Sequence, residues 1–228
     1  MWTRKELKLQ SKEALGRVYW KAVLISALFA LIVGGGSCFK YVADNKDPII
    51  RSMTDTILSF PALMVIFGMV MSLAALIGAL AKILLVNPFC VGVCSFRIKA
   101  MRGEGNVSDL GEGFDSEYKR NVQTMLLVDI FTFLWSLLLV VPGIIKMYEY
   151  MMVPYILADD PAVTRKEAFE RSKEMMRGNK WRALVLDLSF ILWDILGVIT
   201  FGIVTVFYVY PYRQLTRGAL YEKLKTGC

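Results

Sequence analysis

The chain contains no histidine among its 228 residues, and this absence excludes several kinds of chemistry. Ser-His-Asp triads, histidine general bases and most catalytic zinc sites all require an imidazole ring. The sequence also contains no phosphate-binding loop, no serine nucleophile elbow and no protein-kinase signature. We therefore assign no catalytic residue, metal or cofactor from the sequence, although carboxylate chemistry stays open.

Cysteine is scarce as well, with four residues in the whole chain. Cys90 and Cys94 are four apart, which places them on one helical face, whereas Cys38 and Cys228 are isolated. A zinc site would need a second close pair or histidine ligands. We expect four free thiols.

Polar sequence is also in short supply. Hydrophobic residues make up 56% of the chain, and the mean hydropathy is +0.48. Soluble domains are roughly 45–50% apolar. The excess is gathered into long runs, which is typical of membrane spans. The polar stretch before the first run is too long for a cleavable signal peptide.

The apolar runs predict six membrane spans, because a bilayer core of ~30 Å needs ~20 helical residues. The fourth and sixth runs are short and need flanking residues to complete them. Pro142-Gly143 and Gly202 predict tight turns between the third and fourth spans and between the fifth and sixth. The predicted spans are about Tyr19–Phe39, Ile57–Val86, Thr124–Val141, Gly143–Ala158, Ala183–Thr200 and Phe201–Tyr212.

Basic residues predict the orientation of these spans. Of the 27 Lys and Arg residues, 22 fall on one side, and the loop between the first two spans holds only Lys40, Lys46 and Arg51. By the positive-inside rule, both termini and the loops around Asp109 and Glu170 are predicted to be cytoplasmic. The net charge of +7 then reflects topology and anionic lipids, not nucleic acid.

The chain also repeats itself. Ten of the 27 positions from Thr3 to Phe29 are identical at an offset of 161 residues, among them Trp20, which matches Trp181. A weaker middle copy at an offset of 58 aligns Asp129 with Asp187. We therefore predict one integral membrane domain, 1–228, with parallel pseudo-repeats at about 1–101, 102–160 and 161–228. Each repeat is predicted to contain a cytoplasmic helix followed by two spans.

The helices that begin the first and last repeats are predicted to be amphipathic. Thr3 with Glu6, and Thr164 with Glu167, have the spacing of a capping box at a helix start. Two alternatives stay open for their apolar faces, which could lie on the membrane surface or pack on other parts of the protein. The predicted apolar faces are Leu7, Ser11, Ala14, Leu15 and Val18 in the first helix, and Ala168, Phe169, Met175 and Met176 in the later one.

Short motifs mark the chain from end to end. They are Thr3–Trp20, Asn87-Pro88-Phe89, Leu134–Leu138, Pro142–Lys146, Pro154–Pro161, Glu167-Ala168, Arg171–Lys173, Gly178–Trp181 and Pro211-Tyr212. These motifs resemble those of a bacterial family of integral membrane proteins, the domain of unknown function 975. The resemblance implies a multi-pass bacterial membrane protein, and it implies no established activity.

The candidates for an intramembrane polar cleft are five ionisable residues inside the apolar segments: Asp129, Lys146, Glu149, Asp187 and Asp194. Such groups are costly in a membrane, and they often line a polar cleft that admits a substrate or an ion. The alternative is local pairing, of Asp129 and Asp187 with flanking Arg or Lys and of Lys146 with Glu149. Asp194 lies deeper, and we predict that it pairs with Lys146 and makes the fourth and fifth spans neighbours.

Together these patterns predict an all-α, polytopic membrane helical bundle of about six spans with amphipathic cytoplasmic helices. The leading expectation is a non-enzymatic, transporter-like or lipid-interacting protein of the bacterial plasma membrane, or an accessory subunit of an export or envelope system. The alternatives are a membrane-embedded enzyme that acts on lipid headgroups through carboxylates and a scaffold or immunity-type binding protein. The expected partners are membrane lipids, with other membrane proteins or a small molecule as further candidates.

Overall fold

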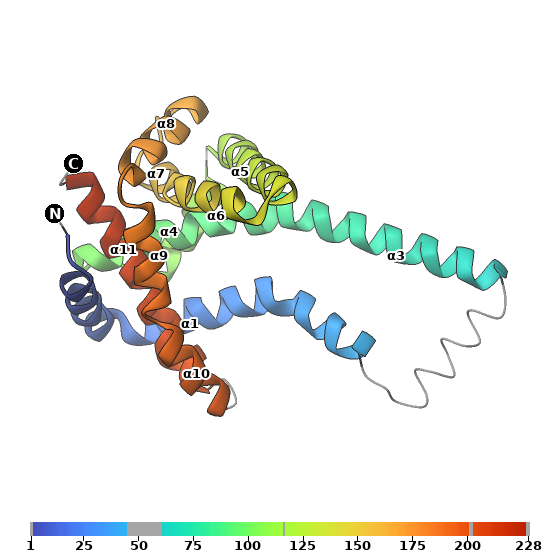
Figure 1. Ribbon diagram of the computed structural model, residues 1–228, viewed down its shortest axis with the longest axis horizontal. Coiled ribbons are helices and arrows are strands. Elements are labelled where there is room, and N and C mark those ends of the chain that lie inside the picture. Colours follow the sequence, from blue (N-terminus) through green and yellow to red (C-terminus); the bar gives the residue numbers. More distant parts are fainter. Residues whose placement is uncertain (1, 45–60, 116, 201–202, 227–228) are drawn as a thin grey trace. The chain divides into compact units, whose positions relative to one another are not determined.

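The computed structural model describes residues 2–44, 61–115, 117–200 and 203–226, and within these ranges every regular element is a helix (Figure 1). The prediction of an all-α chain is therefore confirmed. The chain divides into two compact units, one made of Met1–Leu28 with Asn87–Cys228 and the other of Phe29–Val86.

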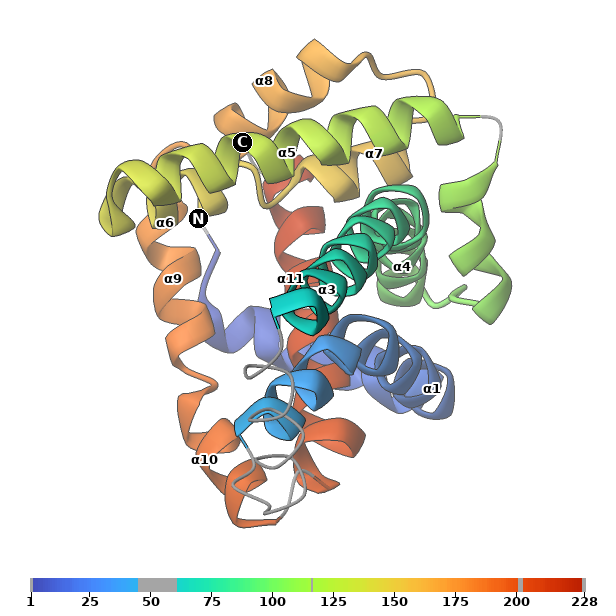
Figure 2. The ribbon, with the colours of Figure 1, turned by 90° about the vertical axis from the view of Figure 1, so that its right-hand side faces the viewer.

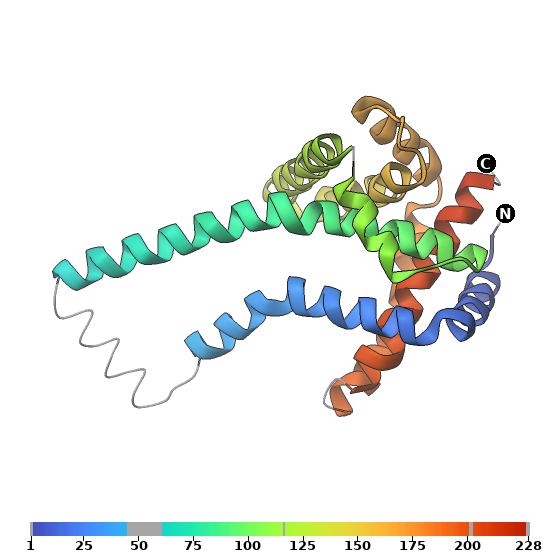
Figure 3. The ribbon, with the colours of Figure 1, turned by 180° about the vertical axis from the view of Figure 1, so that it is seen from behind.

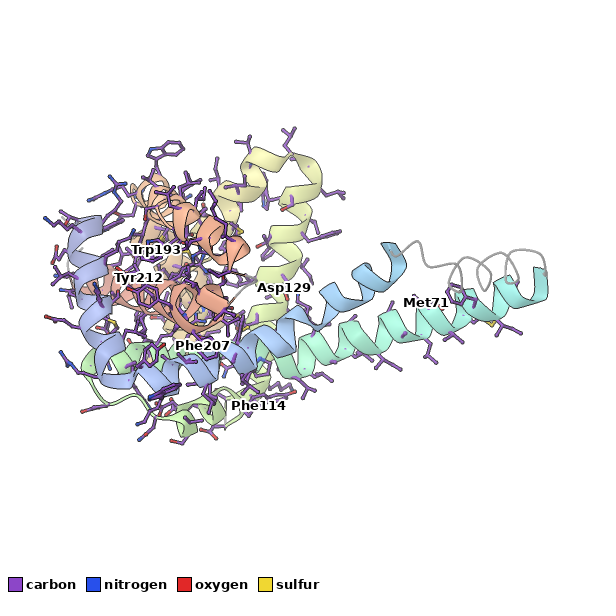
Figure 4. All side chains as sticks on the ribbon, turned by 90° about the horizontal axis from the view of Figure 1, so that it is seen from below. Met71, Phe114, Asp129, Trp193, Phe207 and Tyr212 are labelled. Carbon is purple, nitrogen blue, oxygen red and sulfur yellow. The ribbon has the colours of Figure 1, made fainter. Side chains whose placement is uncertain are left out.

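The second unit contains the end of α1 (Arg4–Asp44), then α3 (Pro61–Ala81) and the π-helical η1 (Lys82–Val86). The described side chains of α3 are almost all exposed and apolar, and Met71 marks this helix in Figure 4. The predicted external loop, with Lys46 and Arg51, lies outside the described residues.

Three helices form the centre of the first unit: α4 (Asn87–Arg102), α7 (Val153–Asp159) and α11 (Tyr210–Thr226). α4 packs against both α7 and α11, and its crossing with α11 is visible in Figure 3. Pro154 lies in the first turn of α7, where the missing N–H is not needed, whereas Pro88 of α4 and Pro211 of α11 each follow a π-helical turn, η1 and η3 (Thr205–Val209). The aromatic residue after each proline is buried: Phe89, Tyr155 and Tyr212.

The predicted loop around Asp109 contains η2 (Val107–Phe114), a 3-10 helix that packs closely on α4. A Cβ atom at Gly92 would overlap the carbonyl oxygen of Leu110, and one at Gly113 would overlap that of Pro88. Lys99 on α4 adds an ion pair with Asp109 at 3.1 Å. Glycine at these two positions therefore allows the backbones to approach.

The third predicted span is α5 (Tyr118–Leu138), and it turns back into α6 (Val140–Glu149) at Leu139. The turn was predicted at Pro142-Gly143, and that prediction is wrong by about three residues. Pro142 lies instead in the first turn of α6, which tolerates proline. Gly143 packs directly against Ser136 of α5 and allows the two helices to lie close together.

The fourth and fifth predicted segments are each divided in the structure. Residues 150–152 separate α6 from the buried α7, and Ser189 and Phe190 separate α9 (Lys180–Leu188) from α10 (Ile191–Ile199). The predicted turn at Gly202 lies outside the described residues. Hydropathy did not find these breaks because a core helix and a lipid-facing helix have similar apolar content.

The π-helical η3 (Thr205–Val209) packs against α10 and continues into α11. The ring of Tyr208 lies 5.4 Å from that of Trp193 and 5.7 Å from that of Tyr212, between the two residues labelled in Figure 4. Gly197 on α10 faces Thr205 on η3 at very close range. Tilted contacts between aromatic rings and a close approach at a glycine therefore join α10 to η3 and the start of α11.

α1 and α8 (Arg165–Met176) begin as predicted. The Thr3 Oγ1 accepts a hydrogen bond from the Glu6 N–H at 3.2 Å, and Thr164 Oγ1 accepts one from Glu167 at 3.3 Å. Every residue of the apolar face predicted for α1 is buried, and α8 lies beside α5 and α7 in Figure 2. Both apolar faces therefore pack on the protein, which was one of the two alternatives.

Candidate functional site

The hairpin arms of the first unit carry an exposed apolar surface. Contiguous patches of this kind are rare on soluble monomers, and they mark contacts with a partner or a membrane. The large exposed apolar side chains include Phe133, Leu134, Leu137, Leu138, Leu139 and Val141 on the α5–α6 arm, and Ile191, Leu192, Ile195, Leu196, Ile199 and Ile203 on the α10 arm.

Two helical stretches of the described chain are long and apolar enough to cross a membrane. One is the 38-residue stretch Val65–Arg102, and its apolar window contains no buried residue. The other is the 21-residue α5, Tyr118–Leu138. These lengths exceed or match the ~20 residues that a bilayer core requires.

The exposed face of α1 changes character at Trp20, whose side chain is 74% exposed. Before it the exposed residues include Lys5, Lys12 and Arg17, and after it they include Leu24 and Leu28. Tryptophan is enriched where an apolar membrane interior meets water.

The later copy of the repeat shows the same change. Trp181 is 72% exposed, follows the exposed Lys173 and Arg177, and precedes the exposed Leu188. Within residues 2–29 and 163–190, the last exposed charged residue lies close to the tryptophan in both copies: it is Lys21, directly after Trp20, in the first copy and Arg177, four residues before Trp181, in the later one.

Asp187 and Asp194 are both held by α11. Asp187 accepts hydrogen bonds from Arg217, at 3.1 and 3.2 Å, and from the Tyr148 hydroxyl at 3.0 Å. Asp194 forms an ion pair with Arg213. Arg213 and Arg217 are one helical turn apart on α11. Their two ion pairs therefore fix the positions of α9 and of the start of α10 along α11. The expected pairing of Asp187 with a flanking arginine is confirmed.

Lys146 pairs with Glu149 at 2.8 Å, so the predicted pair of Lys146 with Asp194 is wrong. Glu149 also accepts a hydrogen bond from Lys180 at the start of α9. The two residues belong to one helix three positions apart, and this local pairing wins over a partner on another segment. Lys146 also lies over the rings of Trp135 and Tyr150.

Asp129 lies on α5, where Figure 4 labels it. Its Oδ2 accepts a hydrogen bond from the Asn87 side-chain amide at 3.1 Å. Asn87 is the first residue of α4, so this contact ties the α5 arm to the central helices. The five predicted residues are thus held in different contacts: Lys146 pairs with Glu149, Asp187 with Arg217 and Tyr148, Asp194 with Arg213, and Asp129 with Asn87.

Sequence reasoning missed Arg97, which is buried among the central helices. It donates a hydrogen bond to the Tyr155 hydroxyl at 3.1 Å, and no described carboxylate forms an ion pair with it. Its Nε has no hydrogen-bond partner in the described part of the chain. The signal that could have found it is its position directly after the apolar run Pro88–Phe96.

Sequence reasoning also missed the role of Asp159, although it belongs to one of the motifs. Its buried carboxylate accepts a hydrogen bond from the Tyr221 hydroxyl at 2.8 Å and forms ion pairs with Arg102 and Lys225. Burial raises the pKa of Asp159, but the hydrogen bonds from Lys225, Tyr221 and Arg102 outweigh burial and hold this pKa below its ordinary value. Asp159 therefore joins α7 to α4 and α11.

The described side chains give little support for catalysis. No group of three or more acidic or cysteine side chains among them could hold a metal ion. A cleft of about 630 Å³ beside α8 is lined by four glutamates and four basic residues, Glu149 and Lys180 among them. Cys90 and Cys94 are free thiols, as predicted, whereas the side chains of Cys38 and Cys228 are not described.

In the residues that the structure describes, every regular element is helical and two helices are long and apolar enough to cross a membrane. The chain belongs to the family described as protein of unknown function (DUF975), whose model matches residues 56–227. The predicted resemblance is confirmed over this range. No curated protein and no solved structure matches the chain.

Proposed function

We propose that this chain is a multi-pass protein of the bacterial plasma membrane that works by binding lipids or a small molecule, not by catalysis. The observation that carries the proposal is the change from charged to apolar exposed residues at both Trp20 and Trp181. A boundary that recurs close to the same tryptophan of a sequence repeat matches a flat interface between water and a bilayer.

The burial of side chains supports parallel repeats. Ser11 and Ser172 are both completely buried, Ala22 and Ala183 are both buried, and the two tryptophans are both exposed. Residues 2–29 and 163–190 thus follow nearly the same order of buried and exposed positions. We propose that the three repeats at about 1–101, 102–160 and 161–228 enter the membrane from the same side.

The hairpin arms fit this topology even though they are short. α6 has ten residues, or ~15 Å of helix, which is about half of a bilayer core. A hairpin returns the chain to the side from which it entered, whether it crosses the bilayer or reaches only partway. We therefore propose that both termini and the segments around Asp109 and Glu170 are cytoplasmic.

A lipid-headgroup enzyme that uses Asp129 or Asp187 is the weaker alternative. A general base must accept a proton from its substrate, but Asp187 is occupied by Arg217 and Tyr148, and Asp129 by Asn87. Ion pairs and hydrogen bonds of this kind position helices without any chemistry. A transporter-like or accessory role requires only that the polar contacts hold the arms in a fixed arrangement.

Extraction and labelling in bacteria test the proposal. The protein should stay in the membrane pellet after carbonate washing. A cysteine introduced by Glu170→Cys should react with an impermeant maleimide only after the membrane is opened. One introduced by Asn45→Cys should react in intact cells. Release by carbonate, or labelling of the Glu170→Cys variant in intact cells, would overturn the proposal.

A further inference from the structure

Two basic residues flank the exposed Trp20 on α1. Arg17 and Lys21 are both exposed, and both reach the turn that follows α4. The Lys21 ammonium donates hydrogen bonds to the Gly105 carbonyl oxygen at 3.1 Å and to Asn106 Oδ1 at 2.7 Å. The Arg17 guanidinium lies beside Gly103 of the same turn. We call Arg17, Trp20 and Lys21 the Trp20 surface.

The positive charges of the Trp20 surface are not neutralised within the described chain. The acceptors that hold Lys21 are a carbonyl and an amide, which carry no net charge. Glu13 lies four residues before Arg17 on α1, and Glu104 lies in the turn after α4. Neither forms an ion pair with Arg17 or Lys21 among the described residues, although Glu13 and Glu222 line the same pocket as Arg17. Two cations therefore stand next to an exposed tryptophan without a direct ion pair in the described part of the chain.

The later repeat provides a natural comparison at Trp181. The position of Arg17 is occupied there by Gly178, and that of Lys21 by Arg182. The Arg182 guanidinium stacks on the Trp2 ring at 4.3 Å and donates a hydrogen bond to the Trp2 carbonyl oxygen. We call Gly178, Trp181 and Arg182 the Trp181 surface. It has the same exposed aromatic residue as the Trp20 surface but lacks a pair of cations that are available to a ligand.

The chemistry of the Trp20 surface fits the headgroup of an anionic phospholipid. Guanidinium and ammonium groups both bind phosphate oxygens, and an indole ring favours the headgroup level of a bilayer. A lipid with a net negative charge gains from both cations, whereas the ammonium of a zwitterionic headgroup is repelled by them. Apolar Leu24 and Leu28 continue the same exposed face and suit the acyl chains.

We infer that the Trp20 surface binds an anionic phospholipid through Arg17 and Lys21. This inference rests on the proposed membrane location and adds a headgroup class and a site to it. The Trp181 surface lacks the cation pair and does not discriminate between headgroups.

Lipid titration of the protein in mild detergent tests the inference, with native mass spectrometry to count bound lipids. Wild type should bind phosphatidylglycerol roughly tenfold or more tightly than phosphatidylcholine, since each basic residue near anionic lipid contributes ~1 kcal/mol, or about fivefold in affinity. The Arg17→Gln/Lys21→Gln variant should lose most of this preference.

The matched control is Arg4→Gln/Lys5→Gln. It removes the same two charges from the same helix, ~20 Å from Arg17. It should keep the preference for phosphatidylglycerol, as should Arg177→Gln beside Trp181. Because Lys21 also anchors the turn after α4, Arg17→Gln alone serves as the second variant. It should reduce the preference several-fold with an unchanged melting temperature.

The outcomes separate the inference from the proposed function. Equal losses in the two double variants, or no preference in the wild type, would overturn the Trp20 site while leaving a membrane protein. A protein that carbonate releases from membranes, and that retains neither lipid, would overturn the proposed function itself. A preference lost only with Arg17 and Lys21 would support both.

Discussion

Two regions of the first unit are built from similar apolar residues but use them in opposite ways. One region is the group of central helices, α4, α7 and α11. The other is the pair of hairpin arms, α5–α6 and α10. The central helices bury Val93, Ile156 and Leu220 against one another, and the arms leave Phe133 and Leu192 exposed. Single exposed apolar residues are normal on soluble proteins, but runs of large exposed apolar residues like those on the arms mark a contact with a partner or a membrane. The difference therefore indicates that the two regions face two environments.

Polar residues differ between the regions in a parallel way. The central helices are joined by charged contacts such as Asp159 with Arg102. The arms close through small residues, with Gly143 against Ser136 and Gly197 against Thr205. Close packing of small residues joins helices where burial of apolar surface gives no driving force, as in lipid.

The largest effect is expected from shortening a leucine in each region. Leu220 is 1% exposed and Leu192 is 77% exposed. Leu220→Ala should lower the free energy of unfolding in detergent by about 2–5 kcal/mol, because it leaves a cavity among the central helices. Leu192→Ala should change it by less than about 0.5 kcal/mol. Similar losses in both variants, measured by denaturant unfolding, would contradict the division into two environments.

A smaller loss is expected from Gly113→Ala. The added Cβ would overlap the Pro88 carbonyl oxygen and force η2 away from α4, at a cost of about 1–3 kcal/mol. The matched control is Gly111→Ala in the same helix, where nothing lies within 4 Å of the added atom. The two melting temperatures should differ by several degrees, and a match between them would rule out the close approach of η2 to α4.

Replacing either of the two aspartates that α11 holds should lower the free energy of unfolding, and the loss should be larger for the aspartate with more contacts. Asp187→Asn weakens contacts with both Arg217 and Tyr148 and should cost about 1–2 kcal/mol. Asp194→Asn weakens only its pair with Arg213 and should cost less than about 1 kcal/mol, since the Asp194 side chain is 40% exposed. A double-mutant cycle on Asp194 and Arg213 should show coupling, and one on Asp194 and Lys146 should show none.

The smallest effect is expected on the stability of the protein at acid pH. The pKa of Asp159 is lower in the folded protein than in the unfolded chain, so its stabilising contribution is complete above about pH 4 and is lost as the pH falls through the folded-state pKa. Asp159→Asn should cost about 1 kcal/mol at pH 7 and should reduce the fall in melting temperature between pH 5 and pH 3. The control is Asp160→Asn, because Asp160 pairs with Arg171 at a more exposed site. This variant should show the same fall in melting temperature between pH 5 and pH 3 as the wild type.

Local features of the fold could be predicted from the sequence. Capping by Thr3 and Thr164, the buried face of α1, and the pair of Lys146 with Glu149 all depend on residues within one or two helical turns. Their spacing alone decides the geometry. The pairing of Asp187 with a flanking arginine was expected as a type of contact, although Arg217 was not identified as the partner.

Long-range features could not be predicted in the same way. Asp194 pairs with Arg213 because α11 runs beside α9 and the start of α10, and no local spacing encodes that arrangement. The burial of α7 was missed because an apolar segment has the same hydropathy in a protein core and in lipid. The turn at Leu139 was missed because proline marks the start of a helix as readily as a turn.

The contacts of α11 set an order for biogenesis. A ribosome releases α1 and α4 long before α11, yet Glu6 on α1 pairs with Lys223 at 2.6 Å and α4 packs against α11. Until the last helix emerges, the inner faces of α1 and α4 lack their native cover. In the proposed topology the arms enter the bilayer during translation, but the central helices can assemble only afterwards, since contacts distant in sequence form late. A nascent chain halted before Tyr210 should therefore be inserted and still be open to proteases at α4.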